Sequence, residues 1–69
     1  MLICTAIAEV YNNEGDSDYE RGDFYSAIES YTQGIKTSCK DDKLNAILFT
    51  NRATSLLNLG KNSHSAVLC

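Results

Sequence analysis

Five acidic side chains lie close together in the first part of the chain, and grouped carboxylates can bind calcium. They are Glu14, Asp16, Asp18, Glu20 and Asp23. A calcium-binding EF-hand loop that began at Asp16 would need glycine at its sixth position and glutamate at its twelfth. This chain has Arg21 and Ala27 there. The pattern therefore favours a solvated helix face, or a docking surface for a basic partner, over a calcium site.

The sulfur and imidazole side chains are too widely spaced to suggest a zinc site. They are Cys4, Cys39, His64 and Cys69. Zinc sites favour pairs of ligands separated by about two to four residues, and no such pair is present in the sequence. A nucleophile built from Cys69 and His64 would need a third orienting group and a formed pocket. We therefore expect no metal, no cofactor and no catalytic residue, and we expect the thiols to be reduced.

The composition is that of an ordinary globular chain with a small negative charge. The 69 residues are 43% hydrophobic and 22% charged, and the formal net charge is −3. An acidic balance argues against binding to nucleic acid or to an anionic membrane surface. The apolar run over residues 2–8 is too short to span a membrane and lacks the basic residues of a signal peptide. These features, with an odd number of cysteines, predict a cytoplasmic protein.

Apolar residues recur at helical spacing in the first segment. From Ile3 to Tyr11 they lie three or four residues apart, which places them on one face of a helix. Gly15 lies on that same face, where a missing side chain would let a neighbouring helix approach closely. We expect this helix to run to about Arg21 and to end at Gly22.

Two further helices are expected after this turn, followed by a partial helix over residues 62–69 that is too short to be a full partner helix. Asp23 can cap the second helix, which fades at about Thr37, and Asp42 can cap the third. The third helix is expected to run to Leu59 and to end at Gly60. The chain contains no proline, which favours uninterrupted helices.

The two turn glycines suggest a repeat. Gly22 and Gly60 are 60 − 22 = 38 residues apart, and a period in this range with two helices per unit is typical of α-solenoids. We predict an all-α fold of antiparallel helical hairpins, about one and a half repeats of an α-solenoid. The predicted organisation is a single unit over residues 1–69, with a first hairpin at 1–38, a loop at 39–42 and an incomplete second hairpin at 43–69.

The turn and the helix crossings resemble the tetratricopeptide-repeat pattern. The first repeat aligns without a gap at Tyr11, Gly15, Gly22, Asp23, Phe24, Ala27, Tyr31 and Gly34. Residues 44–53, with their Asn51-Arg52-Ala53 core, are similar to the second repeat of chaperone-binding proteins. Together these segments resemble the N-terminal repeats of the tetratricopeptide repeat protein 4 family of heat-shock co-chaperones. The resemblance implies a protein-binding scaffold, in a truncated member because a third repeat is absent from the sequence.

The resemblance also implies a groove that grips the C-terminal carboxylates of a chaperone. Asn51 matches the clamp asparagine of the second repeat, while Asn12 stands in place of a clamp lysine and Asp16 in place of a clamp asparagine. An ionised Asp16 offers acceptors only and would repel an incoming carboxylate. The peptide-binding residues implied are therefore Asn12, Asp16 and Asn51, in an incomplete clamp. Arg52 is expected to pair with an acidic residue of a neighbouring helix.

The function predicted from these observations is protein–protein interaction, in a module that resembles a chaperone-binding co-chaperone domain and is not an enzyme. The expected partner is a protein or peptide, such as the C-terminal tail of heat-shock protein 90 or 70, and neither a nucleic acid nor a membrane. The alternative is a truncated repeat fragment that binds no peptide. Such a fragment would self-associate into a homo-oligomer through exposed apolar helix faces.

Overall fold

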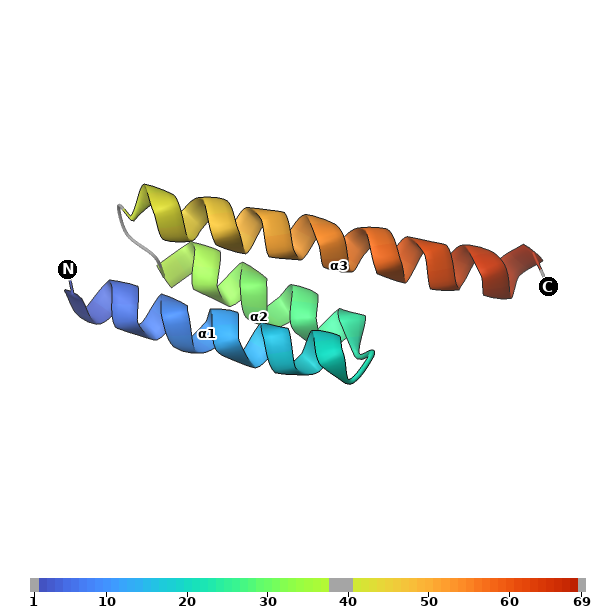
Figure 1. Cartoon of the computed structure of the whole chain (residues 1–69), viewed down its shortest axis with the longest axis horizontal. Coiled ribbons are helices and arrows are strands. Elements are labelled where there is room, and N and C mark those ends of the chain that lie inside the picture. Colours follow the sequence, from blue (N-terminus) through green and yellow to red (C-terminus); the bar gives the residue numbers. More distant parts are fainter. Residues whose placement is uncertain (1, 38–40, 69) are drawn as a thin grey trace.

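Three helices packed side by side make up the structure (Figure 1). The computed structural model describes residues 2–37 and 41–68, and its helices are α1 (Leu2–Glu20), α2 (Phe24–Thr37) and α3 (Asp42–Leu68). α2 runs antiparallel to both of its neighbours, so α1 and α3 point in the same direction (Figure 1). α2 packs against both, and α1 and α3 also contact each other. Within the described ranges the fold is all-α and built from antiparallel hairpins, as the sequence predicts.

α1 ends at the glycine where the sequence predicts its end. Gly22 has a φ of 81°, in the left-handed region that residues with a side chain disfavour. Its amide donates to the Tyr19 carbonyl at 2.9 Å, and the Asp23 amide donates to the Asp18 carbonyl at 2.9 Å. These two hydrogen bonds form a Schellman motif, which satisfies the last carbonyls of α1 and reverses the chain.

Asp23 caps α2, which confirms the prediction for this residue. Its carboxylate accepts hydrogen bonds from the Ser26 hydroxyl at 2.8 Å and from the Ser26 amide at 3.2 Å. These bonds hold the pKa of Asp23 below its ordinary value of 3.8, because they favour the charged carboxylate. The short turn from Gly22 to Asp23 therefore both ends one helix and starts the next.

The cap of α3 is Asp41, and our expectation of Asp42 is wrong by one residue. The Leu44 amide donates to Asp41 Oδ1 at 3.0 Å, which is the pattern of an N-cap. Asp42 is the first helical residue, where a carboxylate also interacts favourably with the helix dipole. Two neighbouring aspartates can each supply the cap oxygen, and the local sequence alone does not distinguish between them.

α3 does not end at Gly60, so the turn expected there is wrong. The helix continues through this glycine to Leu68 and is 27 residues long. Among the described glycines a positive φ is found at Gly22 and not at Gly60. A glycine inside a helix costs only about 1 kcal/mol relative to alanine. Continuation adds a backbone hydrogen bond at each further residue, so it offsets that cost. The division into a complete first hairpin and an incomplete second one stays a prediction.

The core lies where α2 meets α1 and α3. Its buried apolar residues are Ala8, Ala27, Tyr31, Leu44 and Leu48. Tyr31 is 1% exposed, and Tyr19 and Ile35 pack against the cluster from its edge. The hydroxyl of Ser55 is also buried, without a hydrogen-bond partner in the described chain. Across the described ranges, no helix combines the length and the hydrophobicity that a membrane crossing needs.

The apolar face predicted for α1 is not the face that packs. Ile3 is 73% exposed and Val10 55%, whereas Ala8 and Gly15 are buried. Small residues form the contact because they let the backbones of neighbouring helices approach closely. Gly15 therefore has the packing role that the sequence predicts, whereas Ile3, Ile7 and Val10 lie at the surface.

Candidate functional site

α1 and α3 are joined by polar side chains at a constant spacing. The Asn51 amide nitrogen donates to Asn12 Oδ1 at 2.8 Å. Farther along both helices, the Asn58 amide nitrogen donates to the Tyr19 hydroxyl oxygen at 2.7 Å. The partners in each pair are 39 residues apart. Because α1 and α3 run in the same direction, this equal separation means that the two helices are held in one register.

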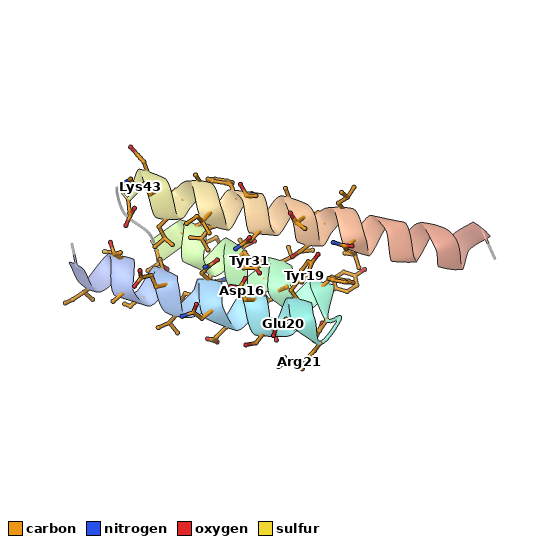
Figure 2. All side chains as sticks on the ribbon, viewed as in Figure 1. Asp16, Tyr19, Glu20, Arg21, Tyr31 and Lys43 are labelled. Carbon is orange, nitrogen blue, oxygen red and sulfur yellow. The ribbon has the colours of Figure 1, made fainter. Side chains whose placement is uncertain are left out.

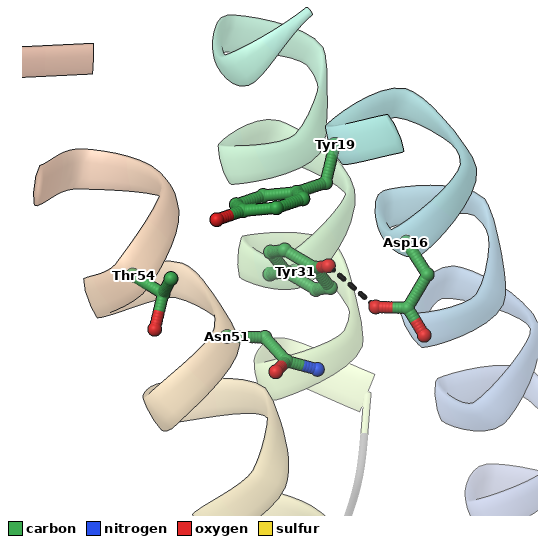
Figure 3. A pocket seen from close by; sticks show the side chains of 5 residues that line it. All are labelled: Asp16, Tyr19, Tyr31, Asn51 and Thr54. Atoms are coloured by element: carbon green, nitrogen blue, oxygen red, sulfur yellow. Dashed lines mark hydrogen bonds between the residues drawn. The ribbon is translucent and has the colours of Figure 1, made fainter. Parts of the chain in front are cut away.

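Tyr31 of α2 fixes the position of the Asp16 carboxylate. The Tyr31 hydroxyl donates to Asp16 Oδ1 at 2.6 Å (Figure 3). Gly15 makes room for the ring, since a Cβ at this position would lie 2.4 Å from Tyr31 Cε1. Burial and the hydrogen bond to Asp16 raise the pKa of Tyr31 well above its ordinary value of 10. The hydroxyl therefore stays a neutral donor, which holds Asp16 beside the space between α1 and α3.

A pocket of about 240 Å³ opens between α1 and α3, and we call it the Asp16 pocket (Figure 3). Its lining residues are Asp16, Tyr19, Tyr31, Asn51 and Thr54. All three helices contribute, and Figure 3 shows the Tyr31 ring between Asp16 on one side and Asn51 and Thr54 on the other. The pocket therefore depends on the packing of the whole molecule.

A second, shallow hollow of about 250 Å³ adjoins this pocket along α3. It is lined by Ala46, Ile47, Thr50 and Asn51. Asn51 borders both hollows, and we refer to the two hollows together as the groove. Two of the three residues that the sequence predicts as peptide-binding, Asp16 and Asn51, line this groove. The third, Asn12, is hydrogen-bonded to Asn51. The structure thus brings Asn12, Asp16 and Asn51 together.

No lysine or arginine with a described side chain lines the Asp16 pocket. These cations are Arg21, Lys36, Lys43 and Arg52. Arg21 pairs with Asp18 beside the Gly22 turn, and Lys43 lies at the opposite end, near the start of α3 (Figure 2). Asp18 itself faces α2, where it accepts from the Ser30 hydroxyl at 3.3 Å. The charge facing the pocket is therefore the negative charge of Asp16.

Arg52 contacts α2, but our expectation of an acidic partner is wrong. Its Nη1 donates to the Thr32 hydroxyl at 3.3 Å, and its guanidinium carbon lies 5.3 Å from the centre of the Phe49 ring. A hydroxyl and an aromatic face together hold the guanidinium without a carboxylate. Arg52 thus braces α3 against α2 and does not point its charge into the groove.

The metal and catalytic expectations concern side chains that are only partly described. Among the described residues, no three histidine, cysteine, aspartate or glutamate side chains are grouped as metal ligands would be. The side chains of Cys39, His64 and Cys69 lie outside the described part. Cys4 is disulfide-bonded, so our expectation of reduced thiols is wrong for this residue. Spacing along the sequence does not determine which cysteines are close in the fold.

The chain is similar in sequence to several curated proteins. It is 43% identical to tetratricopeptide repeat protein 4 of Homo sapiens over 60 residues, which cover 87% of this chain and 15% of that protein. It is 43% identical to the Bos taurus protein of the same name over 53 residues, covering 77% and 14%. It is also 36% identical over 53 residues to the Saccharomyces cerevisiae Hsp70/Hsp90 co-chaperone CNS1, again covering 77% and 14%. The chain is a tetratricopeptide-repeat segment related to these proteins.

The tetratricopeptide-repeat segment spans about one seventh of the length of these relatives, 14–15%. No protein-family profile and no solved structure matches it significantly. The 39-residue register between α1 and α3 fits the repeat class, because equivalent helices of successive repeats stack in parallel. This register is longer than the period of about 34 residues that is typical of the class.

Sequence reasoning missed three residues of the site. The sequence patterns predict no position for Tyr19, and they do not single out Thr54 or Asn58. Thr54 lines the pocket, Tyr19 borders it, and Asn58 ties Tyr19 to α3. A signal for two of them exists in the sequence, since Asn51, Thr54 and Asn58 recur at helical spacing on one face of α3. This polar stripe is the face of α3 that bonds to α1 and borders the Asp16 pocket.

Proposed function

We propose that this chain is the interaction module of a co-chaperone-like protein and that its groove holds an extended segment of a partner protein. The observation that carries the proposal is the Asp16 pocket, where side chains from three helices converge on one open hollow. The chain is related to a protein named as an Hsp70/Hsp90 co-chaperone, which supports a protein partner. Concave surfaces between stacked helices are the usual binding surfaces of helical repeats.

Asn12, Asp16 and Asn51 are the residues that we propose to contact the partner segment. Asn51 borders both hollows of the groove, so a segment lying along α3 would pass over it. Asn12 orients the Asn51 amide through their 2.8 Å hydrogen bond. Asp16 is held at the edge of the same surface by Tyr31. The three side chains therefore act as one polar strip along the partner backbone.

The C-terminal tail of heat-shock protein 90 or 70 is the partner that the relatives suggest. For such a tail the clamp is incomplete, because the described groove provides amide donors and no cation. One hydrogen of the Asn51 amide is donated to Asn12, which leaves one for a carboxylate. Asp16 would repel that carboxylate. We therefore propose that binding of a chaperone tail is weak in this chain.

Other classes of function have less support. The relatives favour an interaction module over an enzyme, and they favour it over the self-associating fragment that we kept as an alternative. The net charge of −3 argues against nucleic acid and anionic membranes as partners. A cytoplasmic location is part of this proposal.

A peptide titration followed by ¹H–¹⁵N NMR tests the proposal. The wild-type chain and the double variant Asn12→Lys with Asp16→Asn are each titrated with a chaperone C-terminal peptide. The variant adds a cation and removes a repulsive charge, so its affinity should rise by more than about ten-fold, since a charged hydrogen bond contributes roughly 1.5–3 kcal/mol. The amides of residues 12, 16 and 51 should shift.

The matched control is Asn13→Lys with Glu14→Gln. Both residues are exposed on α1 and neither lines the groove, while the change in net charge is the same as in the test variant. An equal gain in the control would mean that net charge, and not the groove, attracts the peptide. No gain in the test variant would remove Asn12 and Asp16 from the proposed site.

A further inference from the structure

The free hydrogen-bonding groups of the Asp16 pocket are mostly acceptors. The Tyr31 hydroxyl donates its hydrogen to Asp16 Oδ1, and the Thr54 hydroxyl donates to the Thr50 carbonyl at 2.9 Å. Both oxygens keep lone pairs that can accept. The Asn51 amide nitrogen is engaged with Asn12, so its Oδ1 is the more available atom. The pocket is therefore better suited to a group that donates hydrogen bonds than to one that accepts them.

Asp16 adds a fixed negative charge to these acceptors. Its Oδ1 accepts from Tyr31, and its Oδ2 has no hydrogen-bond partner in the described chain. The pocket provides no cation to neutralise it, since its other lining residues are uncharged. The neutral donors that remain are the second Asn51 N–H and the Tyr19 hydroxyl hydrogen, and neither cancels a full charge. A ligand that enters must bring positive charge of its own to gain from this site.

Tyr19 gives the pocket an aromatic wall. Its ring packs edge-on against Phe24, with 5.2 Å between the ring centres, and its hydroxyl accepts from Asn58 at 2.7 Å. These two contacts hold the ring over the pocket (Figure 3). The face of an aromatic ring attracts a cation through its quadrupole. A carboxylate beside an aromatic face suits the guanidinium of arginine, which donates hydrogen bonds and stacks on the ring. It also suits the ammonium of lysine, which donates hydrogen bonds.

We propose that the Asp16 pocket binds a cationic side chain, an arginine or a lysine, of the partner segment. This inference rests on the proposed function, because it takes the groove as the peptide site and names the chemistry that it selects. The volume of about 240 Å³ is that of several water molecules, which is enough for the charged head group and the end of its stem. The pocket thus prefers a basic segment to an acidic tail.

The test uses the 69-residue chain and two capped pentapeptides, each with four Gly and Ser residues around one central residue. The central residue is arginine in one and citrulline, its neutral isostere, in the other. Titrations are followed by ¹H–¹⁵N NMR at the amides of residues 16, 19, 51 and 54. The arginine peptide should shift these amides and bind at least about ten-fold more tightly than the citrulline peptide. Raised salt should reduce this difference.

Two variants locate the charge. Asp16→Asn keeps an oxygen for the Tyr31 hydroxyl and removes the negative charge, so the preference for arginine should disappear. Glu14→Gln removes the same charge from an exposed position of α1 outside the pocket and should keep the preference. A thermal melt followed by circular dichroism confirms that both variants fold. Persistence of the preference in Asp16→Asn, or its loss in Glu14→Gln, would overturn the inference.

A chaperone C-terminal peptide added in parallel separates this inference from the proposed function. If that acidic peptide shifts the groove amides and the arginine peptide does not, the inference fails while the groove remains a peptide site. If neither peptide shifts them, the groove is not a peptide site and both fail together. If the arginine peptide shifts them and depends on Asp16, the inference stands.

Discussion

A single missing side chain determines where the charge of the pocket lies. Gly15 leaves space for the Tyr31 ring, and Tyr31 in turn holds the Asp16 carboxylate with a 2.6 Å hydrogen bond. The ring is 1% exposed and its hydroxyl is tied to Asp16, so it has little freedom to move aside. The position of Asp16 therefore depends on the residue before it in the sequence.

Gly15→Ala should destabilise the fold although alanine is the better helix former. The new methyl group would lie 2.4 Å from Tyr31 Cε1, so the ring or the helix must shift. Overpacking of this kind costs about 1–3 kcal/mol, and the gain in helix propensity of about 1 kcal/mol offsets only part of it. Urea unfolding followed by circular dichroism measures the loss. Asn13→Ala, at an exposed position of α1, is the control and should not destabilise; equal stability of both variants would contradict the packing.

At the scale of the element, the long α3 is the feature that distinguishes this structure from a plain pair of hairpins. α3 extends beyond the Gly22 turn that joins α1 and α2 (Figure 1). Leu56 is 50% exposed and Leu57 61% exposed before that extension begins, so the packed part of α3 already leaves large apolar side chains at the surface. The backbone hydrogen bonds of the helix continue through Gly60 into the extension and support it.

Alanine substitutions at Gly22 and Gly60 distinguish a continuous α3 from a turn at Gly60, which the sequence predicts. Gly60→Ala should stabilise by about 0.5–1 kcal/mol, because this glycine is helical and a Cβ there meets nothing within 4 Å. Gly22→Ala should destabilise by about 1–2 kcal/mol, because its φ of 81° is costly for any residue with a Cβ. The free energies of unfolding in urea give both values. A loss at Gly60 as large as at Gly22 would mean that the chain turns there.

The starts of the helices were more predictable than the end of α3, for a physical reason. A start depends on a capping side chain and a few neighbouring amides, so Asp23 was predicted correctly and the cap of α3 was missed by one residue. The end at Gly22 is equally local, since its Schellman bonds join residues next to the turn. Whether Gly60 turns or continues depends on whether a following helix packs back against α3. The sequence around Gly60 does not carry that information.

At the scale of the molecule, the groove exists because α1 and α3 are held side by side across α2. The family resemblance predicted Asn12, Asp16 and Asn51 as site residues, and their role in binding stays a prediction. The resemblance and the sequence patterns did not predict the tie between Tyr19 and Asn58, because it depends on the register between two helices that are distant in sequence. The Tyr31–Asp16 bond also joins separate helices, and it determines which atoms of Asp16 remain free for a ligand.

A double-mutant cycle on Tyr19 and Asn58 measures how strongly this register is held. Tyr19→Phe keeps the ring contact with Phe24 and removes the oxygen that accepts from Asn58, while Asn58→Ala removes the donor. The Asn58 side chain also donates to the Thr54 carbonyl within α3, and the cycle cancels this local effect. Because a neutral hydrogen bond contributes about 0.5–1.5 kcal/mol, we expect a coupling energy of that size from urea unfolding of the four proteins.

A cycle on Thr32 and Tyr19, which lie on different helices without a mutual hydrogen bond among those described, is the control and should give no coupling. Zero coupling for Tyr19 and Asn58 would mean that α1 and α3 are not locked in one register, and the Asp16 pocket would then lack the fixed wall that its preference for a cation requires.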